Sequence, residues 1–121
     1  MISKARTKFI KSLQLKKYRV ASQAFIVEGE KSVLEVLDSN FIVSELFATQ
    51  EFLSNHPAAS AKSKQIVEAS PDELSAAGTY RTNDGALAVV ATKPNVPWEM
   101  EGGFGILLDD INDPGNFGTI I

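Results

Sequence analysis

The 121-residue sequence contains no cysteine, which excludes disulfide bonds and thiolate metal sites. No apolar run approaches the roughly 18 residues of a membrane-spanning helix, so we expect no membrane partner. The amino-terminus is basic but lacks the apolar core of a secretory signal. Together these absences lead us to expect a cytoplasmic protein.

Motifs of several enzyme classes are also missing. The chain has no nucleophile elbow, no phosphate-binding P-loop and no dinucleotide fingerprint. The single histidine, His56, lies in an Asn-His-Pro turn with no nucleophile beside it, and we expect it in a surface loop. Asp109, Asp110 and Asp113 lack a regular ligand spacing, and acidic residues before a helix are favourable without any ion. We therefore predict no metal site.

Acidic residues are absent from the first 20 positions. This stretch holds seven cations, which are Lys4, Arg6, Lys8, Lys11, Lys16, Lys17 and Arg19. The rest of the chain holds five cations and all fifteen acidic residues, giving a net charge of −3. Because salt screens charges beyond about 10 Å, a polyanion would respond to the local positive excess. The seven cations are candidate RNA contacts; the alternative is a solvated helix face whose cations pair with acids elsewhere.

What is present is an alternation of helix and strand signals up to residue 93. Helices are predicted to begin at Ser3, Glu30, Thr49 and Ser70, the last at a capping box with proline in its first turn. Strands are predicted over 24–27, 41–48, 65–69 and 85–92, and a surface loop over 56–64. This order predicts a small α/β/α sandwich.

The region after residue 93 has a different composition. Prolines and glycines favour a linker over 94–103, in which Trp98 is expected to pack on another part of the protein. An apolar strand is predicted over 104–108, followed by acidic and turn-forming residues and the start of a helix. Because its sheet is missing, we expect this strand to be mobile, to pack on a neighbouring molecule, or to join a sheet edge.

Two motifs carry a family resemblance. The final fifteen residues, 107–121, resemble the first signature of the SpoU/TrmH branch of SPOUT RNA 2′-O-ribose methyltransferases. Phe25-Ile26-Val27-Glu28-Gly29 resembles the F-x-V-E-G element of the substrate-binding domain that precedes their catalytic domain, and residues 85–90 follow in the family's order. The resemblance implies an RNA substrate-binding domain over 1–93, similar to kink-turn-binding ribosomal proteins, and the truncated start of a knotted catalytic domain over 104–121.

The same resemblance implies a chemistry for the parent enzyme. It would be a homodimer that transfers methyl groups from S-adenosylmethionine to ribose in ribosomal or transfer RNA, with Asn116 near the reacting ribose. An arginine that usually follows the position of Ile121, and the later motifs of the cofactor pocket, are absent. We therefore expect the chain alone to be monomeric and inactive and to bind no cofactor. A plain turn over 114–116 is the alternative within this chain.

A second group of candidate RNA contacts surrounds Gly29. The missing Cβ of Gly29 lets another backbone come close. Lys31 is placed to reach a phosphate there. Arg81 lies in another loop that we expect at the same edge. The alternative is a tight turn at Gly29, solvated Lys31 and Arg81, and a Glu28 that starts a helix or forms an ion pair.

Two other functions remain open. One is a free-standing RNA-binding module of the ribosomal-protein type. The other is a protein-interaction domain whose basic helix docks on an acidic partner.

Overall fold

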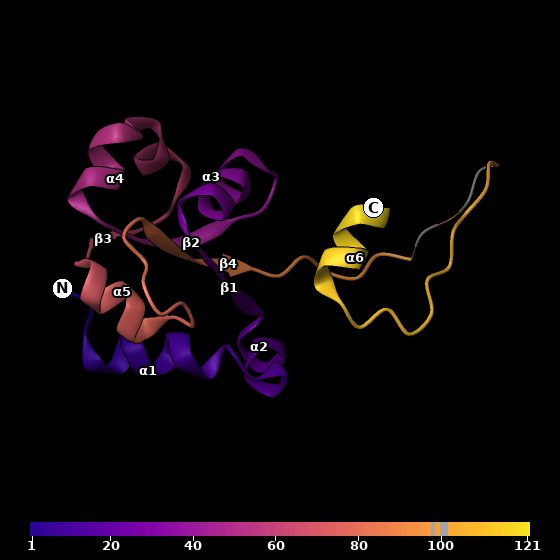
Figure 1. The fold of residues 1–121 in the computed structure, drawn as a ribbon, viewed down its shortest axis with the longest axis horizontal. Helices are drawn as coiled ribbons and strands as arrows, with labels where there is room; N and C mark the ends of the chain where they lie inside the picture. Colours follow the sequence, from indigo (N-terminus) through magenta and orange to yellow (C-terminus); the bar gives the residue numbers. More distant parts are fainter. Residues whose placement is uncertain (98, 100–101) are drawn as a thin grey trace.

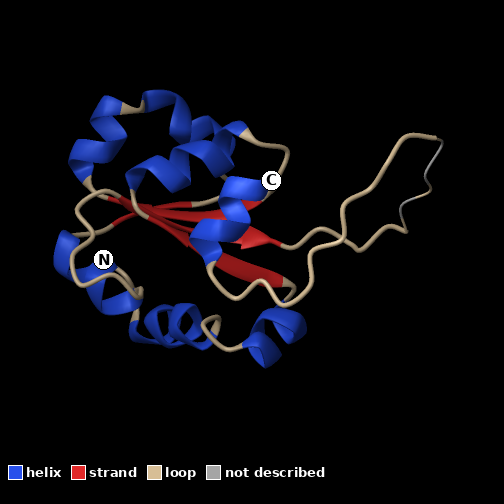
Figure 2. Cartoon of the chain, turned by 45° about the vertical axis from the view of Figure 1, so that its right-hand side comes forward, coloured by secondary structure: helices blue, strands red, loops and turns tan. Residues whose placement is uncertain are grey.

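A four-stranded sheet lies between two layers of helices in the computed structural model, which describes residues 1–97, 99 and 102–121 (Figure 1, Figure 2). The expected packing of Trp98 therefore lies outside the described residues. The elements in chain order are α1 (Lys4–Ser12), α2 (Lys16–Ser22), β1 (Ala24–Glu28), α3 (Glu30–Asp38), β2 (Val43–Ala48), α4 (Gln50–Asn55), the 3₁₀-helix η1 (Pro57–Lys62), β3 (Ile66–Glu68), α5 (Pro71–Ala77), β4 (Ala86–Ala91) and α6 (Pro114–Ile120). The predicted α/β/α sandwich is confirmed.

The strand order in the sheet is β1-β4-β2-β3. Strand β4 runs antiparallel to both of its neighbours, and β2 and β3 are parallel to each other. Strand β1 is therefore an edge strand. Gly29 N–H donates to the Ala86 carbonyl and Thr92 N–H donates to the Gln23 carbonyl. By the alternation of an antiparallel ladder, the backbone polar groups of Ala24, Ile26 and Glu28 point away from β4.

Each face of the sheet carries its own apolar core. In β4, Ala86, Ala88 and Val90 belong to the core beneath α3, α4 and η1, whereas Leu87 and Val89 belong to the core with α1 and α5. This alternation follows from the two-residue period of a strand, and a strand buried on both faces is apolar throughout. The layers visible in Figure 2 are held mainly by these two cores.

A bulge in β2 changes which face its side chains occupy. Val43 pairs with Val90, yet Glu45 pairs with Val89, so Ser44 is the extra residue. Val43 consequently enters the core under α3, and Glu45 faces the side of α1, where an acidic side chain meets a basic helix. Without the bulge, Val43 and Glu45 would share one face.

Local signals place most helices correctly. The helix predicted to begin at Glu30 is α3, which starts at that residue. At α5 the Ser70 Oγ accepts the Glu73 N–H at 3.3 Å while the Glu73 carboxylate accepts the Ser70 N–H at 2.9 Å, and Gly78 is the C-cap. Thr49 caps α4 by accepting the Phe52 N–H at 3.2 Å. The strand predicted from residue 41 begins instead at Val43.

The prediction of a surface loop over 56–64 is wrong in part. Residues 57–62 form η1, and Ala59 within it is buried in the core beneath α3. Pro57 favours the first turn of a helix because its φ is fixed, and Ala59 adds apolar contact. His56 precedes this turn and is half-buried.

The predicted strand over 104–108 is also wrong. Residues 104–109 form no regular structure, and Phe104 and Leu107 are 88% and 93% exposed. An extended segment becomes a strand only when a neighbour satisfies its backbone, and no described strand pairs with it. Helix α6 follows after Asp113 caps it, and all its residues are exposed. Among the described residues, no helix is long and apolar enough to cross a membrane.

Candidate nucleic-acid interface

The end of β1 is fastened to the loop over residues 79–85 by a buried carboxylate. Glu28 accepts the Thr79 N–H at 2.9 and 3.0 Å, the Thr79 hydroxyl at 2.7 Å and the Tyr80 N–H at 3.3 Å. Hydrogen bonds to an ionised acceptor are stronger than those between neutral groups. Glu28 therefore neither starts a helix nor forms an ion pair, and instead anchors this loop.

The loop is held at its other end as well. The buried Asn83 donates from Nδ2 to the Ala86 carbonyl at 3.0 Å, accepts the Gly85 N–H at 3.2 Å, and donates its own N–H to Ser75 Oγ at 2.9 Å. A Cβ added at position 78 would collide with Oε2 of Glu28, so glycine there lets the carboxylate stay in contact with the loop. The exposed residues 80–82 are therefore presented by a loop that is fixed at both ends.

Gly29 joins β1 to α3 with a φ of 85°, a conformation that favours glycine. A Cβ built on it would lie 3.2 Å from Cε2 of Tyr80. The predicted close approach occurs, although a side-chain ring makes it and not a second backbone. The loop that carries Arg81 thus shares an edge with Gly29, and Lys31 is exposed in the first turn of α3.

Two of the seven amino-terminal cations bind within the protein. Arg6 and Glu45 form an ion pair, in which Nε donates to Oε2 at 2.6 Å. Arg19 donates to the carbonyls of Leu13 at 3.0 Å and Gln14 at 2.7 Å, at the end of α1. A cation is favourable there because the last carbonyls of a helix lack partners.

The other five cations are exposed lysines on α1 and α2. None forms an ion pair with any residue in the described part of the chain; they are Lys4, Lys8, Lys11, Lys16 and Lys17. The Lys17 ammonium lies 4.7 Å from the centre of the Tyr18 ring. The charge segregation noted in the sequence therefore persists on the surface as unneutralised positive charge.

Two adjoining cavities of about 480 and 530 Å³ follow the open edge of β1 and share Arg19 and Phe25. We call them together the β1 groove. Its lining residues are Leu13, Gln14, Lys16, Arg19, Val20, Gln23, Phe25, Ile26, Glu28, Thr79, Tyr80, Thr92, Lys93, Pro94 and Asn95.

Sequence reasoning missed Tyr80 and Lys93, because only the strand order shows that β1 is an edge. Lys93 is fixed by Asn40 and by the Phe41 ring, 4.0 Å away.

Only some of the RNA-binding residues predicted from the sequence lie at the β1 groove. Lys16 and Arg19 line it, and Gly29 and Arg81 lie beside its Tyr80 end. By contrast, α1 begins near the opposite edge, where the Met1 ammonium donates to the Glu68 carbonyl of β3 at 2.8 Å. Lys4 therefore lies far from the groove along α1.

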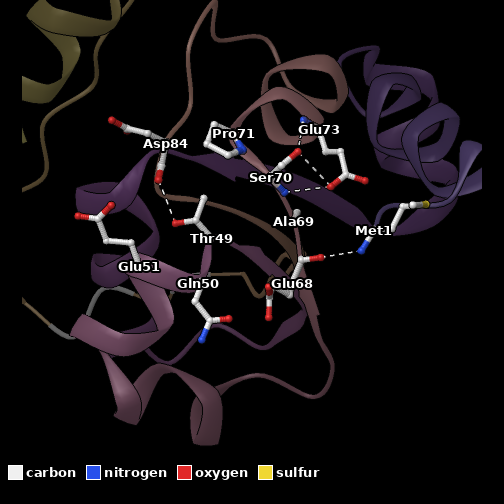
Figure 3. A pocket seen from close by; sticks show the side chains of 10 residues that line it. All are labelled: Met1, Thr49, Gln50, Glu51, Glu68, Ala69, Ser70, Pro71, Glu73 and Asp84. Atoms are coloured by element: carbon white, nitrogen blue, oxygen red, sulfur yellow. Dashed lines mark hydrogen bonds between the residues drawn. The ribbon is translucent and has the colours of Figure 1, made fainter.

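A third cavity, of about 510 Å³, has the opposite electrostatic character (Figure 3). It lies where β2 and β3 end, and four acidic residues contribute to its lining: Glu51, Glu68, Glu73 and Asp84. Hydrogen bonds from the backbone N–H of Ser70 and of Ile2 lower the pKa of Glu73 from its ordinary 4.5. Carboxylates disfavour phosphate, so this cavity is unsuited to RNA.

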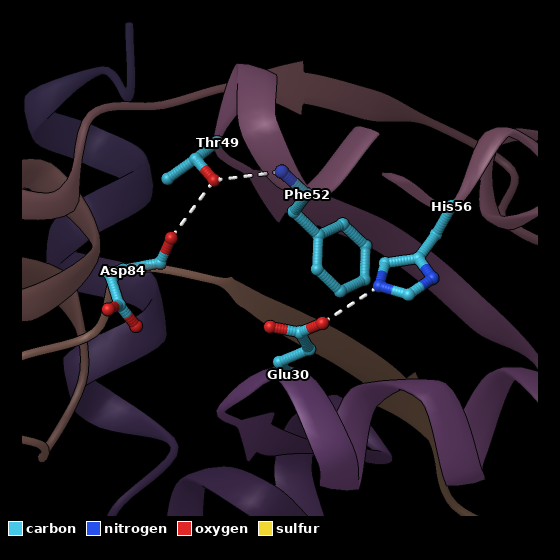
Figure 4. A network of polar contacts seen from close by, with 5 residues as sticks. All are labelled: Glu30, Thr49, Phe52, His56 and Asp84. Carbon is cyan, nitrogen blue, oxygen red and sulfur yellow. Dashed lines mark hydrogen bonds and ion pairs between the residues drawn. The ribbon is translucent and has the colours of Figure 1, made fainter. Parts of the chain in front are cut away.

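His56 belongs to a polar network between α3 and α4 (Figure 4). Its Nε2 lies 2.8 Å from the Glu30 carboxylate and its ring is 4.9 Å from that of Phe52. Thr49 Oγ1 in the same network donates to the Asp84 carbonyl at 3.0 Å. The expected surface-loop histidine is thus a half-buried residue that joins α3 and α4.

Residues 4–88 match the family model of the MRM3-like substrate binding domain. The chain belongs to this family. The matched range ends inside β4 and includes the F-x-V-E-G element together with the loop that Glu28 anchors. The resemblance to SpoU/TrmH enzymes drawn from the sequence motifs is thereby confirmed.

Two curated relatives are rRNA methyltransferases by name. The chain is 32% identical to the 23S rRNA guanosine 2′-O-methyltransferase RlmP of Bacillus subtilis over 92% of its length. It is 22% identical to the mitochondrial rRNA methyltransferase 3 of Xenopus laevis over 98% of its length. The chain spans 43% and 30%, respectively, of these two relatives, so the MRM3-like domain corresponds to less than half of each.

Solved structures agree with this fold. A TrmH-family RNA methyltransferase from Porphyromonas gingivalis superposes with a TM-score of 0.71 and 32% identity, covering 99% of this chain and 47% of that one. An AdoMet-bound rRNA methyltransferase from Sinorhizobium meliloti gives a TM-score of 0.63 at 19% identity, covering 78% of this chain and 37% of that one. The latter similarity shows the fold alone.

The carboxy-terminal residues of this chain lie at the surface of the structure. Asn116 lies in α6, where its N–H donates to the Asp113 carboxylate at 2.8 Å, and every residue from 109 to 121 is exposed. Asp113, the acidic residue before the helix, thus acts as its N-cap. No group of His, Cys, Asp or Glu with the arrangement of a metal site occurs among the described residues.

Proposed function

We propose that this domain binds ribosomal RNA through the β1 groove and the lysines of α1 and α2, and so positions a ribose for 2′-O-methylation by its parent protein. The observation that carries this proposal is the unneutralised positive charge beside an open sheet edge, away from the acidic cavity. Family membership supports the same assignment, and the names of the two curated relatives favour ribosomal over transfer RNA.

The candidate cations are expected to contribute unequally to RNA binding. Lys16 of α2 lines the groove and Arg81 follows Tyr80 at its end, so their ammonium and guanidinium groups are the proposed phosphate contacts there. Lys17 of α2 and Lys31 of α3 are exposed residues that add positive charge outside the groove lining. Lys4, Lys8 and Lys11 extend the positive surface along α1. Arg6 contributes less, because Glu45 already neutralises it. Arg19 bonds to carbonyls at the end of α1 and so shapes the groove.

The test is a titration of a structured ribosomal RNA fragment at two salt concentrations, for example 50 and 200 mM. Each cation that binds a phosphate releases a counterion, so the logarithm of the affinity falls as the logarithm of the salt concentration rises. The slope is about 0.7 to 0.9 per phosphate contact. The variant Lys16→Gln/Lys17→Gln is expected to reduce the slope by about 1 to 2. Lys64→Gln, an exposed lysine before β3, is the matched control and should leave it unchanged. Absence of binding at low salt, or binding that high salt does not weaken, would contradict the proposal.

The parent protein is proposed to be a homodimeric SpoU/TrmH-type methyltransferase of the cytoplasm, in which S-adenosylmethionine supplies the methyl group. Asn116 is the proposed residue of this chain near the reacting ribose. Residues 109–121 are all exposed, and the chain alone is proposed to be an inactive monomer. Incubation with RNA and methyl-labelled S-adenosylmethionine, alongside sedimentation of the chain, tests both statements; methylated RNA or a stable dimer would refute them.

A further inference from the structure

Tyr80 is an exposed aromatic residue at one end of the β1 groove. Its side chain is 50% exposed at the Glu28 end of the β1 groove, in a cavity of about 480 Å³ that it shares with Arg19 and Phe25. A cavity of this size lies within the range that holds small organic ligands. An exposed ring beside cationic residues is the combination that binds unpaired nucleotides, since a base stacks on the ring while a cation meets the phosphate.

The ring is also held in place before any ligand arrives. The Tyr80 N–H donates to Glu28 at 3.3 Å, and the adjacent Thr79 is bound to the same carboxylate by three contacts. The ring lies against Gly29, where any Cβ would be 3.2 Å from Cε2. A tyrosine has only two side-chain torsions, so a preset ring loses little entropy when a base stacks on it.

Resting on the proposed function, we propose that Tyr80 stacks on an unpaired RNA base and makes this domain prefer RNA with unpaired nucleotides over a continuous duplex. Glu28 and Gly29 position the ring, and Arg81, the next residue, reaches the phosphate beside that base. A paired base cannot reach the ring, because its faces are covered by its neighbours in the helix. The same ring contributes nothing to duplex binding, which depends on the lysines and Arg81 through their contacts with phosphates.

The experiment compares two RNAs of equal length and charge, a stem-loop and a fully paired duplex, with the full 121-residue chain and three variants. Tyr80→Leu should weaken stem-loop binding by about 5- to 150-fold, the range of one base stacked on an aromatic ring, and leave duplex binding unchanged. Tyr80→Phe should bind both RNAs like the wild type. Tyr18→Leu is the matched control, because Tyr18 is similarly exposed but covered by the Lys17 ammonium.

A second readout separates stacking from a folding defect. With 2-aminopurine at each loop position in turn, binding of the wild type and of Tyr80→Phe should quench fluorescence at one position, and Tyr80→Leu should not. Equal stem-loop affinities of the wild type and Tyr80→Leu, with salt-dependent binding intact, would overturn the stacking proposal alone. Absence of salt-dependent binding of either RNA by the wild type would overturn the proposed function and this inference with it.

Discussion

Glu28 and Thr79 are 51 residues apart in the sequence, yet both oxygens of the Glu28 carboxylate accept the Thr79 N–H, at 3.0 and 2.9 Å. This contact ties the last residue of β1 to the loop that presents Tyr80 and Arg81. Glu28, the glutamate of the F-x-V-E-G element, therefore has a structural role that does not involve direct contact with RNA. The glycine that follows leaves room for the Tyr80 ring.

Replacing Glu28 with glutamine should destabilise the fold by about 1 to 3 kcal/mol, the cost of leaving buried polar groups without a good acceptor. The amide has a single acceptor oxygen, and its NH₂ group would face backbone N–H groups. Urea unfolding measures the change in the free energy of unfolding. Glu35→Gln is the matched control, since Glu35 is exposed on α3. If both variants unfolded like the wild type, the anchoring role of Glu28 would be wrong.

The positive φ of Gly29 predicts that a methyl group added at this position lowers the free energy of unfolding. Gly29→Ala should lose about 1 to 2 kcal/mol of stability, because an L-residue is strained at this φ and the new Cβ would press on Tyr80. Gly118→Ala provides the comparison, since nothing lies within 4 Å of its added Cβ. Thermal unfolding of the two variants measures the difference; equal midpoints would show that the turn at Gly29 adapts freely.

The Arg6–Glu45 pair can be tested by a double-mutant cycle. Glu45 is nearly buried and Arg6 is more exposed, so we expect a coupling energy of about 1 to 2 kcal/mol between Arg6→Ala and Glu45→Ala. The single variant Glu45→Ala leaves a cation that water can still solvate, whereas Arg6→Ala leaves a carboxylate with little access to water. Arg6→Ala should therefore be the more destabilising. Additive effects of the two substitutions would show that the pair contributes nothing.

The lowered pKa of Glu73 predicts a dependence of stability on pH. A carboxyl whose pKa is lower in the folded state adds stability above its unfolded value, near 4.5, and loses it as pH falls through the folded value. The wild type should thus exceed Glu73→Gln in stability at neutral pH, and the difference should shrink below pH 4.5. Unfolding curves at several pH values test this; a difference that stays constant down to acid pH would contradict the assigned cause, the hydrogen bonds from Ser70 and Ile2.

The exposed apolar side chains at the start of the carboxy-terminal segment predict weak, transient self-association that appears only at high protein concentration and forms no stable dimer. Phe104, Ile106 and Leu107 are all largely exposed and close together in sequence. Replacing the three with serine should therefore shift sedimentation toward a single species at high protein concentration, because apolar area no longer favours contact between copies. A wild-type chain that stays monomeric at all concentrations would show that these side chains do not associate.

Much of the local structure was determined by the sequence itself. Ser70, Pro71 and Glu73 specify the start of α5 because a cap, a fixed φ and a returning carboxylate act within four residues. The helical spacing of Val33, Leu34 and Leu37 specifies α3 in the same way, and all three pack in one core. The absence of acidic residues from the first 20 positions predicts the positive surface of α1 and α2. These signals depend only on near neighbours, so they do not require knowledge of the fold.

Other features were decided only by the tertiary structure. The sequence showed seven equivalent cations, but a bulge in β2 turns Glu45 toward Arg6 and neutralises one of them. Likewise, the strand order makes β1 an edge, brings Tyr80 to Gly29 and creates the groove. Residues 104–108 have the composition of a strand and yet form none, because a strand exists only through hydrogen bonds to a partner that lies elsewhere in the chain. Pairings between distant segments depend on topology, and no local pattern encodes them.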